Sequence, residues 1–244
     1  YLQHGDFGEL DRLLSESEKR LPGTPVWAQM RAELNNRRGR PEQAVEALAE
    51  AYEIRPAPQT MAALAEGLIR ADQPAEALQL LRQEPDWLQQ AWQLRSLQGR
   101  ALAAAGQESH AVNAFTSAFE LAGTNIQAVG RVATTVIQAL GREQAEQILA
   151  ERARSDVSGQ SDLLLAQVRL SGGDREQAVQ SLENLRMRLG ADNPLMPQLL
   201  RLLASAHYQV GAYEKSRDAY NALLEINPND MTALNNLAYM LAED

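Results

Sequence analysis

A pattern that recurs about every 34 residues constrains this sequence more than any other feature. Each copy has a glycine or polar turn followed by a helix-forming segment, as in the copies that begin at Gly39, Gly106 and Gly173. A fixed period of this length indicates an array of two-helix units that stack on one another. Counted between the small residues that follow each turn, the intervals are 34, 33, 34, 34, 33 and 38 residues. These aligned positions, here called the anchors, are Leu10, Ala44, Ala77, Ala111, Ala145, Ala178 and Ser216.

Two further classes of residue keep a fixed distance from the anchors. A small residue in each of two antiparallel helices lets the backbones approach closely, and a large residue one turn further on fills the remaining space. The pattern therefore predicts a helix hairpin in each copy. The large residues, four places after each anchor, are Leu14, Leu48, Leu81, Phe115, Leu149, Leu182 and Tyr220. The small residues, twelve places before each anchor from Ala44 onward, are Ala32, Ala65, Gly99, Ala133, Ala166 and Ala204.

The repeat length and these offsets resemble the tetratricopeptide repeat. Proline stands twelve residues after an anchor at Pro22, Pro56 and Pro228, where it would end the second helix. Ala, Leu, Gln, Glu and Arg dominate and aromatics make up 5% of the chain, which favours helix throughout. The resemblance implies an all-α fold, a right-handed α-solenoid of about six helix-turn-helix repeats with an orphan helix at each end. The alternative is another helix-pair solenoid, although HEAT-type repeats are longer, at about 40 residues or more.

We expect residues 1–244 to form one superhelical domain that is a section of a longer solenoid. The two orphan helices would each leave an apolar face uncovered, open to a further repeat or to self-association. At the end of the chain this face would include Leu234, Leu237, Ala238 and Leu241. The predicted repeats are 1–22 (second helix only), 25–56, 58–85, 92–123, 126–157, 159–190, 197–229 and 231–244 (first helix only).

The sequence departs from the family pattern at a few places. Arg31 and Gln98 stand where the first helix usually buries Leu, and Glu84 and Arg152 stand where the second helix usually has Ala. We expect Pro85 to end one second helix early. The 38-residue interval predicts an insertion of about one helical turn within 186–197.

Charge and composition exclude several classes of function. The net charge is −9, from 32 acidic and 23 basic residues, and no basic cluster could neutralise a row of phosphates, which disfavours nucleic-acid binding. The chain has no Cys, which excludes disulfides and thiolate sites and leaves the compartment open. No apolar run approaches the ~18 residues of a membrane span, so we expect no membrane contact.

The residue types give no support to catalysis, a cofactor or a metal site. The three histidines, His4, His110 and His207, are not spaced as paired ligands. We expect His207 to pack in the core and His110 to be exposed. The carboxylates follow the spacing of solvated helix faces, and no nucleotide, hydrolase, zinc or calcium motif is present. The chain is therefore predicted not to be an enzyme, with no catalytic, cofactor-binding or metal-binding residues.

The candidate site is the concave groove that first helices line in the family. Gln recurs eighteen residues before five successive anchors, and its amide can donate and accept hydrogen bonds to a peptide or a polar polymer. The alternative is that Gln is an ordinary helix former near a helix start. Charges of both signs share the groove, including Glu33 and Arg37, whereas positions that clamp a terminal carboxylate in the family hold residues such as Ala62 and Ser96. The candidate partner-binding residues are Gln59, Glu66, Arg70, Gln93, Arg100, Gln127, Arg131, Gln160, Gln167, Gln198, Arg201, Tyr208, Asn235 and Tyr239.

Tryptophan could also anchor a partner. We expect Trp27 to pack locally, whereas Trp87 and Trp92, in an irregular connection, could do either.

We predict a scaffold that binds another protein. The composition and the Asn-Asn-Leu-Ala-Tyr segment at 235–239 are similar to large bacterial envelope proteins of exopolysaccharide biosynthesis and export. That resemblance implies a periplasmic scaffold that recruits a polymer-modifying enzyme. One alternative is a groove that contacts polysaccharide directly, and another is a cytoplasmic regulatory or chaperone module.

Overall fold

A computed structural model describes residues 7–243, so His4 lies outside the described range. Within that range the chain is all α-helical and has no strand, as the sequence predicts. The helices are α1 (Phe7–Arg20), α2 (Pro25–Arg37), α3 (Pro41–Ile54), α4 (Pro58–Arg70), α5 (Pro74–Leu81), α6 (Pro85–Gln90), α7 (Trp92–Ala104), α8 (Glu108–Ala122), α9 (Ile126–Leu140), α10 (Arg142–Ala153), α11 (Gln160–Gly172), α12 (Arg175–Arg188), α13 (Met196–Gln209), α14 (Tyr213–Ile226) and α15 (Met231–Glu243).

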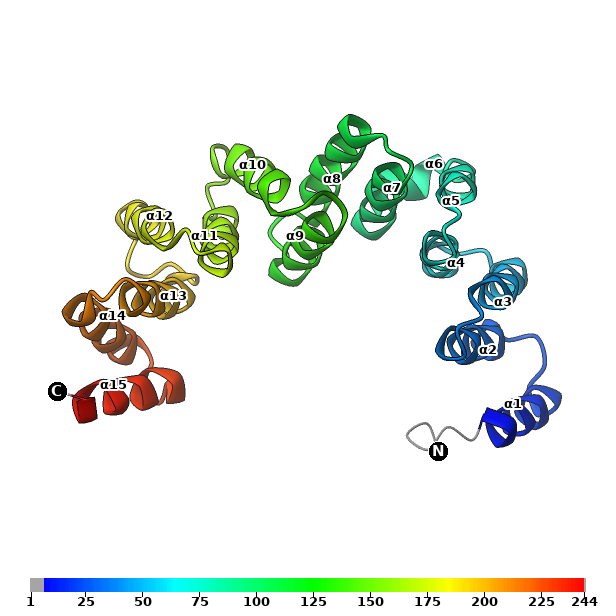
Figure 1. The fold of residues 1–244 in the computed structure, drawn as a ribbon, viewed down its shortest axis with the longest axis horizontal. Helices are drawn as coiled ribbons and strands as arrows, with labels where there is room; N and C mark the ends of the chain where they lie inside the picture. Colours follow the sequence, from blue (N-terminus) through cyan, green and yellow to red (C-terminus); the bar gives the residue numbers. More distant parts are fainter. Residues whose placement is uncertain (1–6, 244) are drawn as a thin grey trace. The chain divides into compact units, whose positions relative to one another are not determined.

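The helices divide into two compact units, one ending at Ala139 and the other beginning at Leu140. Within each unit the pattern is that of a helix-pair solenoid. A first helix packs against the second helix that follows it, as α2 does with α3 and α13 with α14. That second helix then packs against the first helix of the next pair, as α3 does with α4 and α12 with α13. In Figure 1, α2 and α4 lie on one side of the first unit and α3 and α5 on the other, which gives two layers of helices.

The turn inside each hairpin depends on a backbone conformation that favours glycine. Gly39 and Gly106 take this place with φ angles of 69° and 71°. The equivalent residue between α4 and α5 is Asp72, the one non-glycine residue in the described range with a positive φ. Aspartate tolerates this conformation better than most residues because its short polar side chain can bond locally.

The positions singled out by the repeat form the core. Every anchor from Ala44 to Ser216 is buried, and so are the small residues twelve places before them and the large residues from Leu48 onward. Phe115 and Leu149 are fully buried in this way. At the last anchor, the Ser216 hydroxyl donates a 2.8 Å hydrogen bond to the carbonyl oxygen of Ala204, the small residue of its own hairpin. The predicted close approach of paired helices is therefore confirmed for the hairpins that lie within one unit, such as α7 with α8 and α13 with α14.

The two irregular places differ in detail from the prediction. Pro85 does not end a second helix: α5 ends earlier, at Leu81, and Pro85 begins the short helix α6. Proline fits there because the first residues of a helix need no backbone hydrogen-bond donor. The predicted insertion is the connection between α12 and α13, in which Leu189 and Leu195 are buried.

One departure from the expected repeat pattern is compensated by charge. The Arg31 guanidinium on α2 donates to Glu18 of α1 at 2.6 Å and to Glu50 of α3 at 2.5 Å. Burial acts to lower the pKa of Arg31, but these two carboxylates outweigh it and raise that pKa above its ordinary value. A cation at a position where we expected Leu thus bridges three helices.

The last helix has an uncovered apolar surface in the described structure. Leu234 and Leu241 are 42% and 65% exposed, Ala238 is exposed and Leu237 is half-buried. Between residues 7 and 243, no helix combines the length and the apolar character that crossing a bilayer would require.

Candidate functional site

First helices of the first unit surround a cavity of about 280 Å³. Ile69 of α4, three residues of α7 including Arg100, and Gln138 and Ala139 of α9 line it. Arg100 and Gln138 supply the polar groups, while alanines and Ile69 supply an apolar floor. The predicted site residue Arg100 therefore belongs to a hollow that three successive first helices share. We call the exposed surface of the first helices of a unit its first-helix face; in this unit the first helices are α2, α4, α7 and α9.

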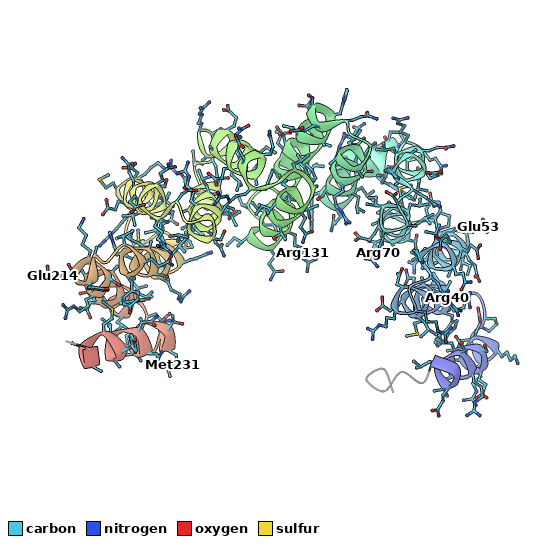
Figure 2. All side chains as sticks on the ribbon, viewed as in Figure 1. Arg40, Glu53, Arg70, Arg131, Glu214 and Met231 are labelled. Carbon is cyan, nitrogen blue, oxygen red and sulfur yellow. The ribbon has the colours of Figure 1, made fainter. Side chains whose placement is uncertain are left out.

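Ion pairs connect the charged residues of this face. Glu66 of α4 accepts from Arg70 on the same helix at 3.2 Å and from Arg100 of α7 at 2.9 Å. Glu33 and Arg37 pair in the same way on α2, at 2.7 Å. In Figure 2, Arg70 projects from α4 on the side that faces away from Glu53, which lies on the second helix α3. Because these five charged residues pair with one another, this part of the face has mixed sign.

The predicted glutamines occupy the first turns of their helices. Gln59, Gln93, Gln127 and Gln198 are exposed, whereas Gln160 is half-buried. This placement satisfies both interpretations, since a residue near a helix start can be an ordinary solvated helix former or a hydrogen-bonding group on the first-helix face. Whether they bind a partner stays a prediction.

Two other predicted residues differ in their availability. Arg131 of α9 is exposed, and Figure 2 labels it beside that helix. Arg201 of α13 instead donates to Asp230 at 2.5 Å. Asp230 is buried and also accepts from the backbone N–H of Ala233 in the first turn of α15. That backbone bond first, and the Arg201 bond next, lower the pKa of Asp230, so Arg201 holds two repeats together.

The remaining predicted residues lie on the first helices of the second unit. Gln167 and Asn235 are exposed. Tyr208 and Tyr239 both line a cavity of about 210 Å³ between α13, α14 and α15. The cavity, here called the tyrosine cavity, is lined by Ser205, Tyr208, Tyr220, Asn236, Tyr239 and Met240.

Hydrogen bonds and ring contacts hold the tyrosine cavity in shape. The amide nitrogen of Asn236 donates to the Tyr220 hydroxyl at 2.9 Å. Tyr208 packs edge-on against Tyr213, with 5.3 Å between the ring centroids. Burial raises the pKa of Tyr220, so its hydroxyl stays protonated and can also donate.

A third cavity, of about 360 Å³, adjoins His207 between α12, α13 and α14. His207 is buried, as predicted, and its Nε2 lies 3.5 Å from a carboxylate oxygen of Glu183. Lys215 approaches the same oxygen at 3.5 Å. Burial lowers the pKa of His207, and this outweighs the opposing effect of Glu183. The imidazole is therefore a neutral core group at pH 7.

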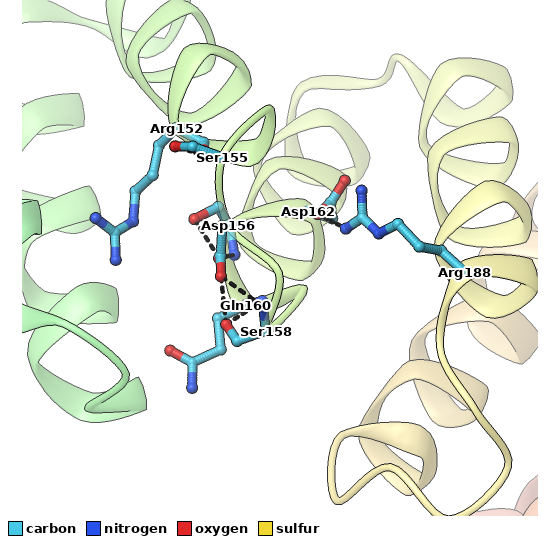
Figure 3. A network of polar contacts seen from close by, with 8 residues as sticks. Arg152, Ser155, Asp156, Ser158, Gln160, Asp162 and Arg188 are labelled. Atoms are coloured by element: carbon cyan, nitrogen blue, oxygen red, sulfur yellow. Dashed lines mark hydrogen bonds and ion pairs between the residues drawn. The ribbon is translucent and has the colours of Figure 1, made fainter.

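The connection between α10 and α11 contains a polar network built on Asp156 (Figure 3). One carboxylate oxygen accepts from the backbone and hydroxyl of Ser158, and the other accepts from the backbone and hydroxyl of Ser161 at 2.8 and 2.7 Å. Burial acts to raise the pKa of Asp156, but these hydrogen bonds outweigh it and lower that pKa. Asp156 thus caps the start of α11, and nothing in its surroundings indicates catalysis.

Sequence reasoning missed several of the lining residues. Gln138 stands seven places before its anchor, as Arg70 does, and Ser205 stands eleven places before its anchor, as Glu66 and Arg100 do. The repeat register could have identified both. Asn236 was not singled out, although Asn235 and Tyr239 on the same helix were.

One of the comparisons with known proteins matches a segment of the sequence to a repeat family. Residues 197–240 match a family model described as "Tetratricopeptide repeat". That segment holds nearly all of α13, all of α14 and most of α15. A comparison with curated proteins finds no match.

Several solved structures match the chain at low sequence identity. One is pilF of Pseudomonas aeruginosa, with 17% identity over 88% of this chain and 97% of that one, and a TM-score of 0.43. Another is YrrB, a TPR protein with an unusual peptide-binding site, with 14% identity, 91% and 96% coverage and a TM-score of 0.39. A third is Naa15/Naa10 bound to HypK-THB, with 18% identity over 98% of this chain and a TM-score of 0.44. The present chain spans 37% of the matched chain in that complex, and 46% of the matched chain in the Cut9-Hcn1 complex.

Proposed function

We propose that this chain, which carries a tetratricopeptide repeat at residues 197–240, is a scaffold that binds another protein through its first-helix face. One observation carries the proposal: α4, α7 and α9 jointly line a hollow with an apolar floor and polar groups at Arg100 and Gln138. A partner side chain could enter that hollow while neighbouring amides bond the partner's backbone.

The charges on the face define the kind of partner. Glu66, Arg70 and Arg100 already pair with one another, so a strongly charged partner would have to break these contacts. An extended polar segment with a few apolar side chains fits better, because the exposed Gln93 and Gln127 can donate and accept with no net charge. The binding segment is therefore proposed to be a protein segment of low net charge.

We further propose a setting for the scaffold: a bacterial envelope assembly for exopolysaccharide modification or export, with the chain in the periplasm and an enzyme as its partner. The support is the similarity of composition and of the segment at 235–239. A cytoplasmic regulatory module is the alternative setting, and the compartment in which the chain is found distinguishes the two. We assign the chain no catalytic role.

A second candidate function is direct contact with a polysaccharide. The tyrosine cavity favours it, because sugar sites combine aromatic rings with neutral polar groups. Tyr208 and Tyr239 are the predicted site residues that line this cavity.

Capture of a partner from native envelope extract tests the main proposal. The test variant combines Arg100→Ala, Gln127→Ala and Arg131→Ala, all in the first unit. A matched control alters the second-helix layer with the same chemistry, as Arg40→Ala, Gln43→Ala and Arg82→Ala, since these three residues are exposed there.

The captured protein is identified and then titrated in purified form against each variant. We expect the first-helix variant to lose binding and the control to keep it. Equal binding by both variants would show that the first-helix face is not the binding surface.

A further inference from the structure

We infer that the tyrosine cavity is a binding subsite for one neutral sugar ring. The inference rests on the second candidate function and deepens it, because it names the site and the class of ligand. It is independent of the protein partner proposed for the first unit.

The walls of the cavity suit the two faces of a sugar ring. Rings of Tyr208, Tyr220 and Tyr239 come from three different helices and surround the same space. An aromatic face packs well against the C–H face of a pyranose, which is apolar. The Tyr208 ring is supported from outside by its edge-on contact with Tyr213, so this wall is already in place before a ligand arrives.

Neutral polar groups between the rings match the hydroxyl groups of a sugar. Among the described residues, the Asn236 side chain bonds only the Tyr220 hydroxyl, which leaves its amide oxygen and second N–H for a ligand. The Ser205 hydroxyl also lines the cavity. Each group can pair with a sugar hydroxyl, which both donates and accepts.

The lining excludes the other simple occupants. None of the six lining residues is charged, and the adjacent Arg201 and Asp230 neutralise each other, so an ionic ligand would lose its hydration without gaining an ion pair. A purely apolar side chain would bury the amide oxygen and the second N–H of Asn236 without a partner for either, which is costly. A neutral ring with hydroxyls satisfies both the aromatic and the polar groups.

The volume sets the size of the ligand. At about 210 Å³ the cavity is smaller than the roughly 300–1,000 Å³ of sites for drug-sized ligands. Tyr208 and Tyr239 at its mouth are 36% and 54% exposed, so the site opens to solvent. It therefore fits one ring, either a free monosaccharide or one residue of a longer chain.

Tyrosine ring signals in the NMR spectrum of the full chain test this inference. The probes are methyl glycosides of glucose, galactose, mannose and N-acetylglucosamine, a short oligosaccharide of each, glucuronate as a charged comparison and N-acetyl-leucine amide as an apolar one. Tyr→Phe variants assign the signals, and Tyr52 in the first unit is the internal control.

We expect at least one neutral glycoside to move the Tyr208 and Tyr239 signals and leave Tyr52 unchanged. A stronger response to the oligosaccharide identifies a polymer as the source, and an equal response identifies a free sugar. Tyr239→Ala should weaken binding about tenfold, whereas Met231→Ala, an exposed residue on the same helix, should not change it.

Three results would overturn the subsite. They are no response to any glycoside, a tighter response to N-acetyl-leucine amide, or unchanged affinity in Tyr239→Ala. If an oligosaccharide moves signals elsewhere while the cavity tyrosines stay unchanged, the subsite is wrong but the second candidate function survives.

Discussion

Gly99 of α7 lies directly against the ring of Phe115 of α8, and a β-carbon at Gly99 would come within 2.8 Å of two of the ring carbons. Atoms of folded proteins do not approach this closely without displacement. The pair shows why the repeat requires a small residue twelve places before its anchor, since Phe115 is one of the two largest fully buried side chains among the described residues.

We predict that Gly99→Ala destabilises the chain. Alanine normally stabilises a helix relative to glycine by about 1 kcal/mol, but here the added methyl would push the Phe115 ring out of place. Overpacking of this kind costs about 1–3 kcal/mol. Urea unfolding followed by circular dichroism measures the change in the free energy of unfolding.

Gly130 provides the matched control, because it lies within α9 and a β-carbon there would meet nothing within 4 Å. Gly130→Ala should therefore stabilise the chain by up to about 1 kcal/mol. Adding Phe115→Leu to Gly99→Ala should cost less than Phe115→Leu costs alone. If Gly99→Ala is as stabilising as Gly130→Ala, the packing account of the repeat is incorrect.

A second prediction concerns the pH dependence of stability. Burial lowers the pKa of His207, with Lys215 and Arg186 acting in the same direction and Glu183 opposing them. Below the unfolded pKa of about 6.5 the unfolded chain then binds more protons than the folded chain. The stability that the buried neutral His207 contributes is fully present above that pH. It is lost as the pH falls toward the pKa of His207 in the folded chain.

Urea midpoints between pH 7.5 and pH 5 check this sign. Wild-type stability should fall more steeply over this range than that of His207→Phe, which cannot be protonated. Carboxylates titrate in both proteins, so the difference between them isolates the histidine. The exposed His110 offers the same substitution, His110→Phe, at a site outside the core for comparison.

The Asp156 cap gives a third prediction. Asp156→Ala removes the acceptor of both the Ser158 and the Ser161 bonds, and should cost about 1–2 kcal/mol, as the loss of a helix cap does. Asp192→Ala, at an exposed carboxylate, should cost less than about 0.5 kcal/mol.

The lowered pKa of Asp156 means that its contribution is present above the unfolded value of about 3.9 and disappears as the pH falls through the folded pKa. The difference between wild type and Asp156→Ala should therefore shrink below pH 4. A difference that persists unchanged into strong acid would argue against the cap.

The repeat register was enough to predict the hairpins and their buried residues. Ala166 and Ala178 are core because each sits at a fixed offset in a 34-residue pattern, and the period alone locates such positions. The register could not locate contacts that occur once. The bridge from Arg31 to Glu18 and Glu50 replaces an apolar contact with a charged one, and the pattern predicts only that a leucine is missing.

The candidate site was predicted less completely for a related reason. Exposed positions such as Gln127 follow from the register, but a cavity depends on which side chains bend toward a common space. Tyr208 and Tyr239 were singled out from sequence, whereas Asn236 enters the cavity because its amide reaches the Tyr220 hydroxyl. The sequence pattern cannot predict that side chains from different helices line one space, because this depends on their three-dimensional arrangement.

The ion pair between Glu66 and Arg100 links two consecutive repeats and leads to the last prediction. The two side chains are 37% and 27% exposed, so solvent screens their attraction, and a double-mutant cycle should give a coupling below about 1 kcal/mol that weakens with added salt. Glu66 keeps Arg70 as a partner when Arg100 is removed, which limits the cost further. Arg100→Ala should therefore remain folded, and a loss of partner binding in that variant would reflect the surface itself and not unfolding. A coupling well above 1 kcal/mol would mean that the pair is structural, and binding would then have to be tested with Gln127 and Arg131 alone.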